Sequence, residues 1–147
     1  MLTQVLKTLY NRDLDRLRKE IGLYANESKI WHIEKGIANS AGNLCLHLIG
    51  NLNTYIGKEL GGNGYVRNRE LEFSQKNVPR NELIKIIDDT KRMVESTLNS
   101  LSNQQLMEEF PVLVYETKMP TGAFLTYLTT HLSYHLGQIN YHRRLLD

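Results

Sequence analysis

The segment from Thr130 to Leu145 reads THLSYHLGQINYHRRL and holds three of the five histidines in the chain. At about 100° of rotation per residue, an α-helix places His131 and His135 roughly 40° apart, one turn from each other. His142 falls on the same stripe of the helix surface. Leucine and isoleucine side chains border this stripe, and the apolar side of an amphipathic helix faces the core. The pattern therefore predicts a helix whose imidazoles point into the protein.

The chain contains four segments in which apolar residues recur every three to five positions, as in an amphipathic helix. These segments cover residues 2–26, 40–60, 81–101 and 121–146. Ser40 is a favourable N-cap type for the second segment, and the pair Gly61 and Gly62 favours its end. No series of strands accompanies them. The sequence predicts an all-α fold, a four-helix bundle with long connecting loops, in a single domain over residues 1–147.

The longest predicted connection reads GNGYVRNRELEFSQKNVP, at residues 62–79. Its glycines, asparagines and proline are typical of a loop, and loops of this length in a domain are often functional. Arg67, Arg69 and Glu70 can bind an anionic part of a substrate or form an ordinary ion pair within the loop. The connections at 27–40 and 111–120 are predicted to be extended or irregular.

Composition excludes several classes of function. Apolar residues make up 41% of the chain and charged residues 23%, which is ordinary for a globular protein. The net charge is +2 and the basic residues are scattered, so nucleic acid is not an expected partner. The single Cys45 cannot form an internal disulfide, which fits a reducing compartment. With neither a signal-peptide pattern nor a membrane-spanning window, we expect a cytoplasmic protein.

The segment at 40–60 carries a polar stripe of its own. Helical rotation places five polar residues on one face: Ser40, Asn43, His47, Asn51 and Thr54. Burying such a stripe between helices costs free energy unless each donor and acceptor has a partner. The stripe therefore predicts a polar site inside the bundle.

Histidines one helical turn apart can converge on one metal ion through their neutral ring nitrogens. A single pair is weak evidence, because packed histidines with ordinary hydrogen bonds are more frequent. A third inward histidine on another helix shifts the balance toward a metal. Three protein ligands with an open position are typical of catalytic zinc sites, whereas structural zinc sites usually have four protein ligands.

The motifs NSAGNLCLHLIGNL (residues 39–52), RNRELEF (67–73) and HLSYHLGQINYHRRLL (131–146) resemble the DinB superfamily, within it the YfiT-like metal-dependent hydrolases of bacteria. The resemblance covers essentially the whole chain. It implies a four-helix bundle in which His47, His131 and His135 bind a divalent metal, and it implies a homodimer. Members with known activity look like thiol-dependent transferases that use glutathione, mycothiol or bacillithiol, and one is a thiol-linked isomerase.

Five further residues are candidates to support the metal ligands or to line the pocket: Asn43, Asn51, Tyr127, Gln138 and His142. The two asparagines can orient His47, hold water or bond across the bundle. Gln138 can bond the backbone or the second nitrogen of a ligating histidine. Tyr127 can offer a hydroxyl to the pocket or pack in the core. His142 lies roughly 10 Å along the helix axis from His135, which favours a cavity, dimer or surface role over a fourth ligand.

A divalent ion, zinc or nickel by preference, would activate water or a small thiol in its open position. Neither helical stripe carries a carboxylate to act as a general base, which favours the thiol. Cys45 lies about 160° from His47 around the helix, so the thiol would be a cosubstrate. The sequence predicts an S-transferase or a hydrolase acting on a small-molecule substrate. The alternative is a non-catalytic, metal-binding, dimerising stress-response module.

Overall fold

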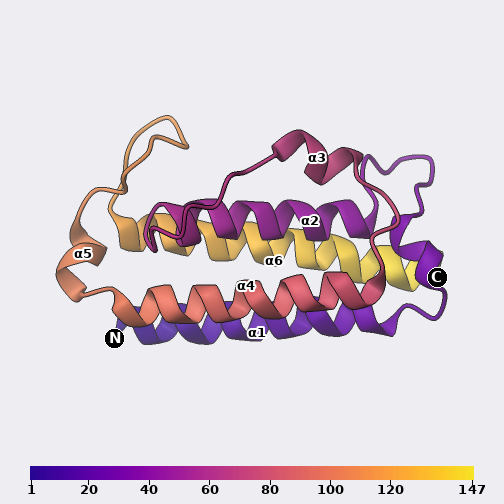
Figure 1. The fold of residues 1–147 in the computed structure, drawn as a ribbon, viewed down its shortest axis with the longest axis horizontal. Coiled ribbons are helices and arrows are strands. Elements are labelled where there is room, and N and C mark those ends of the chain that lie inside the picture. The colour runs from indigo at the N-terminus through magenta and orange to yellow at the C-terminus, as the bar shows by residue number, and fades with distance from the viewer.

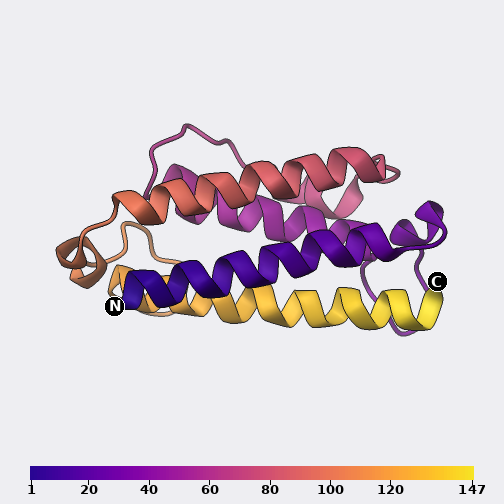
Figure 2. The same cartoon turned by 90° about the horizontal axis from the view of Figure 1, so that it is seen from below.

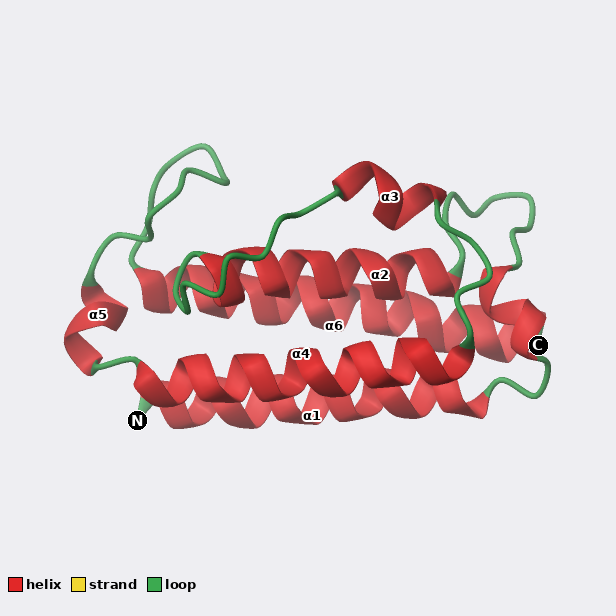
Figure 3. Cartoon of the chain, in the orientation of Figure 1, coloured by secondary structure: helices red, strands yellow, loops and turns green.

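Four long helices lie side by side in the computed structural model, which describes residues 1–147 (Figure 1). They are α1 (Leu2–Leu23), α2 (Ala41–Leu52), α4 (Arg80–Ser100) and α6 (Thr121–Leu146). Helix α1 packs against α4 and α6, and α2 packs against the same two helices. The chain forms no strands, as the colouring in Figure 3 shows. The all-α fold predicted from the apolar spacing is confirmed.

The direction of the helices explains the long central connection. Helices α1 and α6 run one way along the bundle, and α2 and α4 run the other way (Figures 1 and 2). Because α2 and α4 are parallel, the chain between them must cross back over the length of the bundle. Residues 59–79 make this crossover, and they include the short helix α3 (Arg69–Ser74). The crossover places α3 against α2.

Helix α2 begins and ends close to the predicted positions. The Ser40 hydroxyl accepts a hydrogen bond from the backbone N–H of Asn43 at 3.1 Å, so Ser40 is the N-cap. After Leu52 the helix continues as a π-helical segment, η2 (Asn53–Lys58). The chain then turns at Gly62, whose φ of 62° is readily adopted by glycine. Helix α1 ends at Leu23, three residues before the predicted boundary near Asn26.

The connections contain short helices that the apolar spacing did not indicate. They are the 3₁₀-helix η1 (Glu27–Trp31) and the helix α5 (Asn103–Met107). Residues 111–119 form an irregular loop, and its base is closed by an isolated bridge between Glu109 and Pro120. The ring of Trp31 covers Gly42, where an added Cβ would lie 2.6 Å from the indole. A side chain at position 42 would therefore displace Trp31.

A single cluster of 28 buried apolar residues fills the space between the helices. Tyr10 on α1 is fully buried, and its hydroxyl donates to the backbone oxygen of Leu125 on α6 at 2.7 Å. Helices α1, α4 and α6 each contribute one apolar face to this cluster, as amphipathic spacing requires, whereas nearly every residue of α2 is buried. None of the helices combines the length and the apolar character needed to cross a membrane.

Candidate metal centre

Three imidazoles meet between α2 and α6. His47 comes from the middle of α2, and His131 and His135 come from successive turns of α6. One ring nitrogen from each histidine lies within 4.8 Å of the other two. The Nε2 atoms of His47 and His131 are 3.2 Å apart. His47 is buried, and the other two rings are partly buried.

A carboxylate sets the orientation of His47. Its Nδ1 lies 3.0 Å from Oε1 of Glu72, which belongs to α3. A hydrogen bond to a carboxylate requires the proton on Nδ1, so the Nε2 lone pair faces the other two histidines. Carboxylates that hold metal-ligating histidines in this way fix the tautomer and raise the basicity of the ligand.

Glu72 is itself held by Arg67. The Nε atom of Arg67 donates to Oε2 at 2.8 Å, and its Nη2 donates to Oε1 at 2.9 Å. Burial acts to raise the pKa of Glu72, but the hydrogen bonds from His47 and Arg67 outweigh it and hold this pKa below the ordinary value. Glu72 is therefore an anion whose two oxygens are both engaged.

Two features of α2 allow the α3 segment to pack closely against it. Gly50 leaves space for the carboxylate, because an added Cβ would lie 1.9 Å from Oε2 of Glu72. The side-chain nitrogen of Asn43 donates to the backbone oxygens of Glu72 at 2.9 Å and Gln75 at 2.8 Å. Asn43 thus supports the metal site through α3, and it forms no hydrogen bond with His47.

Gln138 orients the imidazole ring of His135. Its Oε1 lies 2.7 Å from Nδ1 of His135, so Nδ1 carries the proton and Nε2 keeps its lone pair. This is one of the two hydrogen bonds that the sequence suggested for Gln138. The Nδ1 atom of His131 is buried and has no hydrogen-bond partner. Two of the three rings are therefore oriented by neighbours, and the third is not.

The donor set fits a divalent ion. His47 and His135 both present an unprotonated nitrogen, and a single proton on His131 can satisfy only one of them. A cation between the rings would accept all three lone pairs, and imidazole is a good ligand for zinc, nickel, copper and iron. Burial lowers the pKa of His131 to about 4, and a second positive charge is also unfavourable beside His135 and His47 when these are protonated and beside Arg67 and Arg69. Burial also lowers the pKa of His135. Both rings are neutral near pH 7, the form that binds metal.

The sequence matches the family described as "Protein of unknown function (DUF1572)" over residues 4–147. The chain belongs to this family. DUF1572 is in the DinB-like fold family, and the all-α structure described above agrees with this. No protein with a curated description matches the chain.

Three other residues of this DUF1572 protein were candidates to support the site or to line its pocket, and of these His142 lines a cavity together with His135. Asn51 is buried, but its Oδ1 has no hydrogen-bond partner. Tyr127 is 53% exposed and lies beside Tyr115, so the core position considered for it is wrong. His142 is buried, and its two nitrogens contact the hydroxyl of Tyr24 at 2.6 Å and the backbone oxygen of His32 at 2.8 Å. Since both nitrogens are engaged, His142 is not a fourth ligand.

Sequence reasoning missed Glu72. The polar faces of α2 and α6 that carry the histidines hold no carboxylate, as expected. The carboxylate of Glu72 reaches His47 from the crossover, which lies outside both faces. The sequence left open whether Arg67 binds an anionic part of a substrate or forms an ion pair within the loop. In the structure Arg67 forms an ion pair with Glu72. Gly50, one turn after His47, was the available signal, because a glycine inside a helix often marks a close approach.

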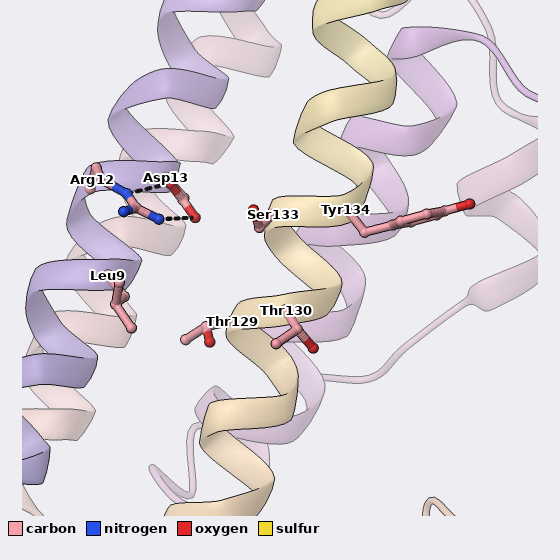
Figure 4. A pocket seen from close by; sticks show the side chains of 7 residues that line it. All are labelled: Leu9, Arg12, Asp13, Thr129, Thr130, Ser133 and Tyr134. Carbon is pink, nitrogen blue, oxygen red and sulfur yellow. Dashed lines mark hydrogen bonds and ion pairs between the residues drawn. The ribbon is translucent and has the colours of Figure 1, made fainter.

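Three hollows border α6, and two of them lie beside His135 or the buried Asp13. The larger, about 680 Å³, is lined by His135, Gln138 and the segment 34–39. The smaller, about 440 Å³, lies between α1 and α6 (Figure 4). There the carboxylate of Asp13 is bound by Arg12 at 2.8 Å, and Ser133 of α6 faces it. Ser133 lies roughly 160° from His135 around the helix, so the smaller hollow is separate from the histidines.

Proposed function

We propose that the protein binds one divalent ion, zinc or nickel, through His47, His131 and His135. The observation that supports this most directly is the convergence of three imidazoles from two helices, two of them held in the ligating tautomer by Glu72 and Gln138. The finer resemblance to the DinB superfamily and its YfiT-like members supports the same three ligands.

We further propose that the site belongs to an enzyme that activates a low-molecular-weight thiol. A divalent ion, when bound, would lower the pKa of a thiol or a water molecule in its open position. Glu72 cannot serve as a free general base, because Arg67 and His47 engage both of its oxygens. A free thiol has a pKa near 8.5, so a modest shift makes it a thiolate at neutral pH without a base. Thiol transfer therefore suits the site better than hydrolysis.

The thiol would come from a cosubstrate such as glutathione, mycothiol or bacillithiol. Cys45 is fully buried, and burial raises the pKa of its thiol to about 12. In the proposed reaction, the cosubstrate sulfur forms a bond to an electrophilic carbon, and the leaving group departs from that carbon. The proton of the thiol passes to solvent. We place this reaction in the cytoplasm, in a homodimer.

Metal content tests the binding site. Purified protein is expected to carry about one ion per chain, as three protein ligands with an open position would hold. The double variant His131→Ala/His135→Ala is expected to carry none by elemental analysis. His32→Gln is the matched control, because His32 is bonded to Glu34 away from the site and should leave the ion in place. Unchanged metal content in the double variant would contradict the proposed ligands.

An assay of thiol transfer tests whether the site activates a low-molecular-weight thiol. Metal-loaded protein would be assayed with each of the three thiols and with a chloro-aromatic or an epoxide acceptor. The expected result is thioether formation that depends on both the metal and the protein. His47→Ala is the negative control, since it removes one ligand. If no thiol gives a rate above that of His47→Ala, the transferase assignment is wrong, whatever the metal content.

A further inference from the structure

The larger hollow, here called the 34–39 cavity, lies between the segment 34–39 and the C-terminal half of α6. Its volume of about 680 Å³ falls within the usual range for small-molecule sites. Six of its lining residues are bulky and apolar or aromatic: Ile37, Leu44, Tyr134, Tyr141, Leu145 and Leu146. A cavity with such walls favours an apolar occupant, because burial removes apolar surface from water.

One end of the 34–39 cavity is the histidine site itself. His135 lines the cavity, and so does Gln138, whose Oε1 is 2.7 Å from Nδ1 of that histidine. Leu44 lies on α2 about one turn before His47. A molecule in the cavity therefore has one end beside His135 and its remaining length against the apolar walls.

The charges around the cavity limit what can bind. Glu34 and Lys35 are the only charged residues in the lining. Glu34 is already bonded to Nε2 of His32 at 2.7 Å, whereas Lys35 forms no ion pair. Glutathione is a tripeptide thiol with several charged groups. In this cavity most of those groups would have no partner, and burying unpaired charges costs free energy. One negative charge could be balanced by Lys35.

The chain just before the 34–39 segment is anchored to the last helix, α6, and to the C-terminal Asp147. The backbone oxygen of His32 accepts a hydrogen bond from Nε2 of His142, and the hydroxyl of Tyr24 donates to Nδ1 of the same ring. The carboxylate of Asp147 accepts hydrogen bonds from the backbone N–H groups of Ala25 and Asn26, at 2.7 and 3.1 Å. The turn before the 34–39 segment is thus tied to the last helix at two points. The cavity is formed before any ligand enters.

From this geometry we infer that the 34–39 cavity binds the electrophilic acceptor, and that the acceptor is an apolar aromatic or aliphatic molecule with at most one negative charge. This inference rests on the proposed function, because thiol transfer requires an electrophilic acceptor. The reactive end of the acceptor is the end beside His135, and the thiol approaches the histidine site from outside the cavity.

The test uses the full chain after metal removal, so that it does not depend on the metal. The probes are 2-naphthoate, which is apolar with one charge, and benzene-1,3,5-tricarboxylate, which carries three. We expect 2-naphthoate to shift the amide signals of residues 34–39 and 134–146 in a heteronuclear NMR titration. We expect the tricarboxylate to leave those signals in place.

Two isoleucines four positions apart, Ile33 just before the 34–39 segment and Ile37 within it, provide a matched pair of variants. Ile37 lines the cavity and is 37% exposed, whereas Ile33 is 47% exposed and does not line it. Ile37→Ser should weaken 2-naphthoate binding about tenfold, as expected for loss of the apolar contact between this aliphatic side chain and the bound probe. Ile33→Ser should leave it unchanged. Tyr141→Ser, at a 62% exposed position on the opposite wall, gives a second test that does not depend on the folding of the first variant.

Several outcomes would overturn the inference whatever the metal content proves to be. They are the absence of shifts with 2-naphthoate, equal weakening by Ile33→Ser, and tricarboxylate binding as tight as that of 2-naphthoate. Shifts that follow protein concentration instead of probe concentration would mean that a second copy of the chain covers the cavity, which also overturns it. A wild-type protein that binds no metal would refute the proposed function. The naphthoate titration would still test the cavity in that case, because it is carried out without metal.

Discussion

Oε1 of Glu72 lies 3.0 Å from Nδ1 of His47, although the two residues are 25 positions apart and belong to different helices. This contact connects the crossover between α2 and α4 to the three-histidine cluster. Arg67, also on the crossover, neutralises the carboxylate and holds it in place. The connection between two parallel helices is thereby part of the site.

Glu72→Gln should weaken zinc binding by about ten- to one-hundredfold, the usual cost of losing a carboxylate behind a ligating histidine. The glutamine can still accept a hydrogen bond from Nδ1, but it loses the charge that strengthens His47 as a ligand. Competition with a chromophoric chelator measures the affinity. Glu70→Gln on the same short helix is the control, because Glu70 is exposed and should have no effect. Equal affinities for the two variants would remove Glu72 from the site.

Gly50→Ala should lower the free energy of unfolding by about 1–3 kcal/mol, the usual cost of overpacking. The added Cβ would lie 1.9 Å from Oε2 of Glu72, so the carboxylate must move and zinc affinity should fall with it. Urea denaturation and the chelator competition measure the two effects. Gly22→Ala in α1 meets no atom within 4 Å and should stabilise slightly, by about 0.5 kcal/mol. The prediction fails if Gly50→Ala behaves like Gly22→Ala.

Acid should destabilise the metal-free protein partly through His142. Burial lowers the pKa of this ring in the folded state, whereas a histidine in an unfolded chain titrates near 6.5. Below about pH 6.5 the unfolded state therefore binds a proton that the folded state does not, and the free energy of unfolding falls as the pH decreases toward the folded pKa. One proton accounts for at most about 1.4 kcal/mol per pH unit.

His142→Gln should flatten this dependence between pH 7 and pH 5 when unfolding is followed in the presence of a chelator. The variant should also be less stable at pH 7, because glutamine cannot keep both hydrogen bonds to Tyr24 and His32. Stability curves of wild type and variant that stay parallel across this pH range would show that His142 does not contribute to the acid sensitivity.

A homodimer through α1 and α6 can be tested at Gly137. A Cβ added at this glycine would have no atom within 4 Å, so a side chain can begin there without a clash. Leu2 and Val5 of α1 and Tyr127 of α6 are exposed large residues, and we expect them to be covered in a dimer. Gly137→Arg should then convert a dimer to a monomer in sedimentation velocity without lowering the melting temperature of the chain. A wild-type protein that sediments as a monomer would refute the dimer.

The sequence by itself determined the local features of this protein. The four amphipathic segments, the N-cap at Ser40 and the pairing of His131 with His135 follow from the rotation of an α-helix, which depends only on spacing along the chain. The bond from Gln138 to His135 has the same origin, since residues three apart meet on one helix face.

Only the tertiary structure decided which distant groups complete the site. The parallel arrangement of α2 and α4 forces the crossover along the bundle, and this path brings Glu72 and Arg67 to His47. Helical spacing also could not show that Tyr127 is exposed or that Asn43 holds α3. Such contacts depend on how the packed helices are placed relative to one another, and the burial of 28 apolar residues in one core sets that placement.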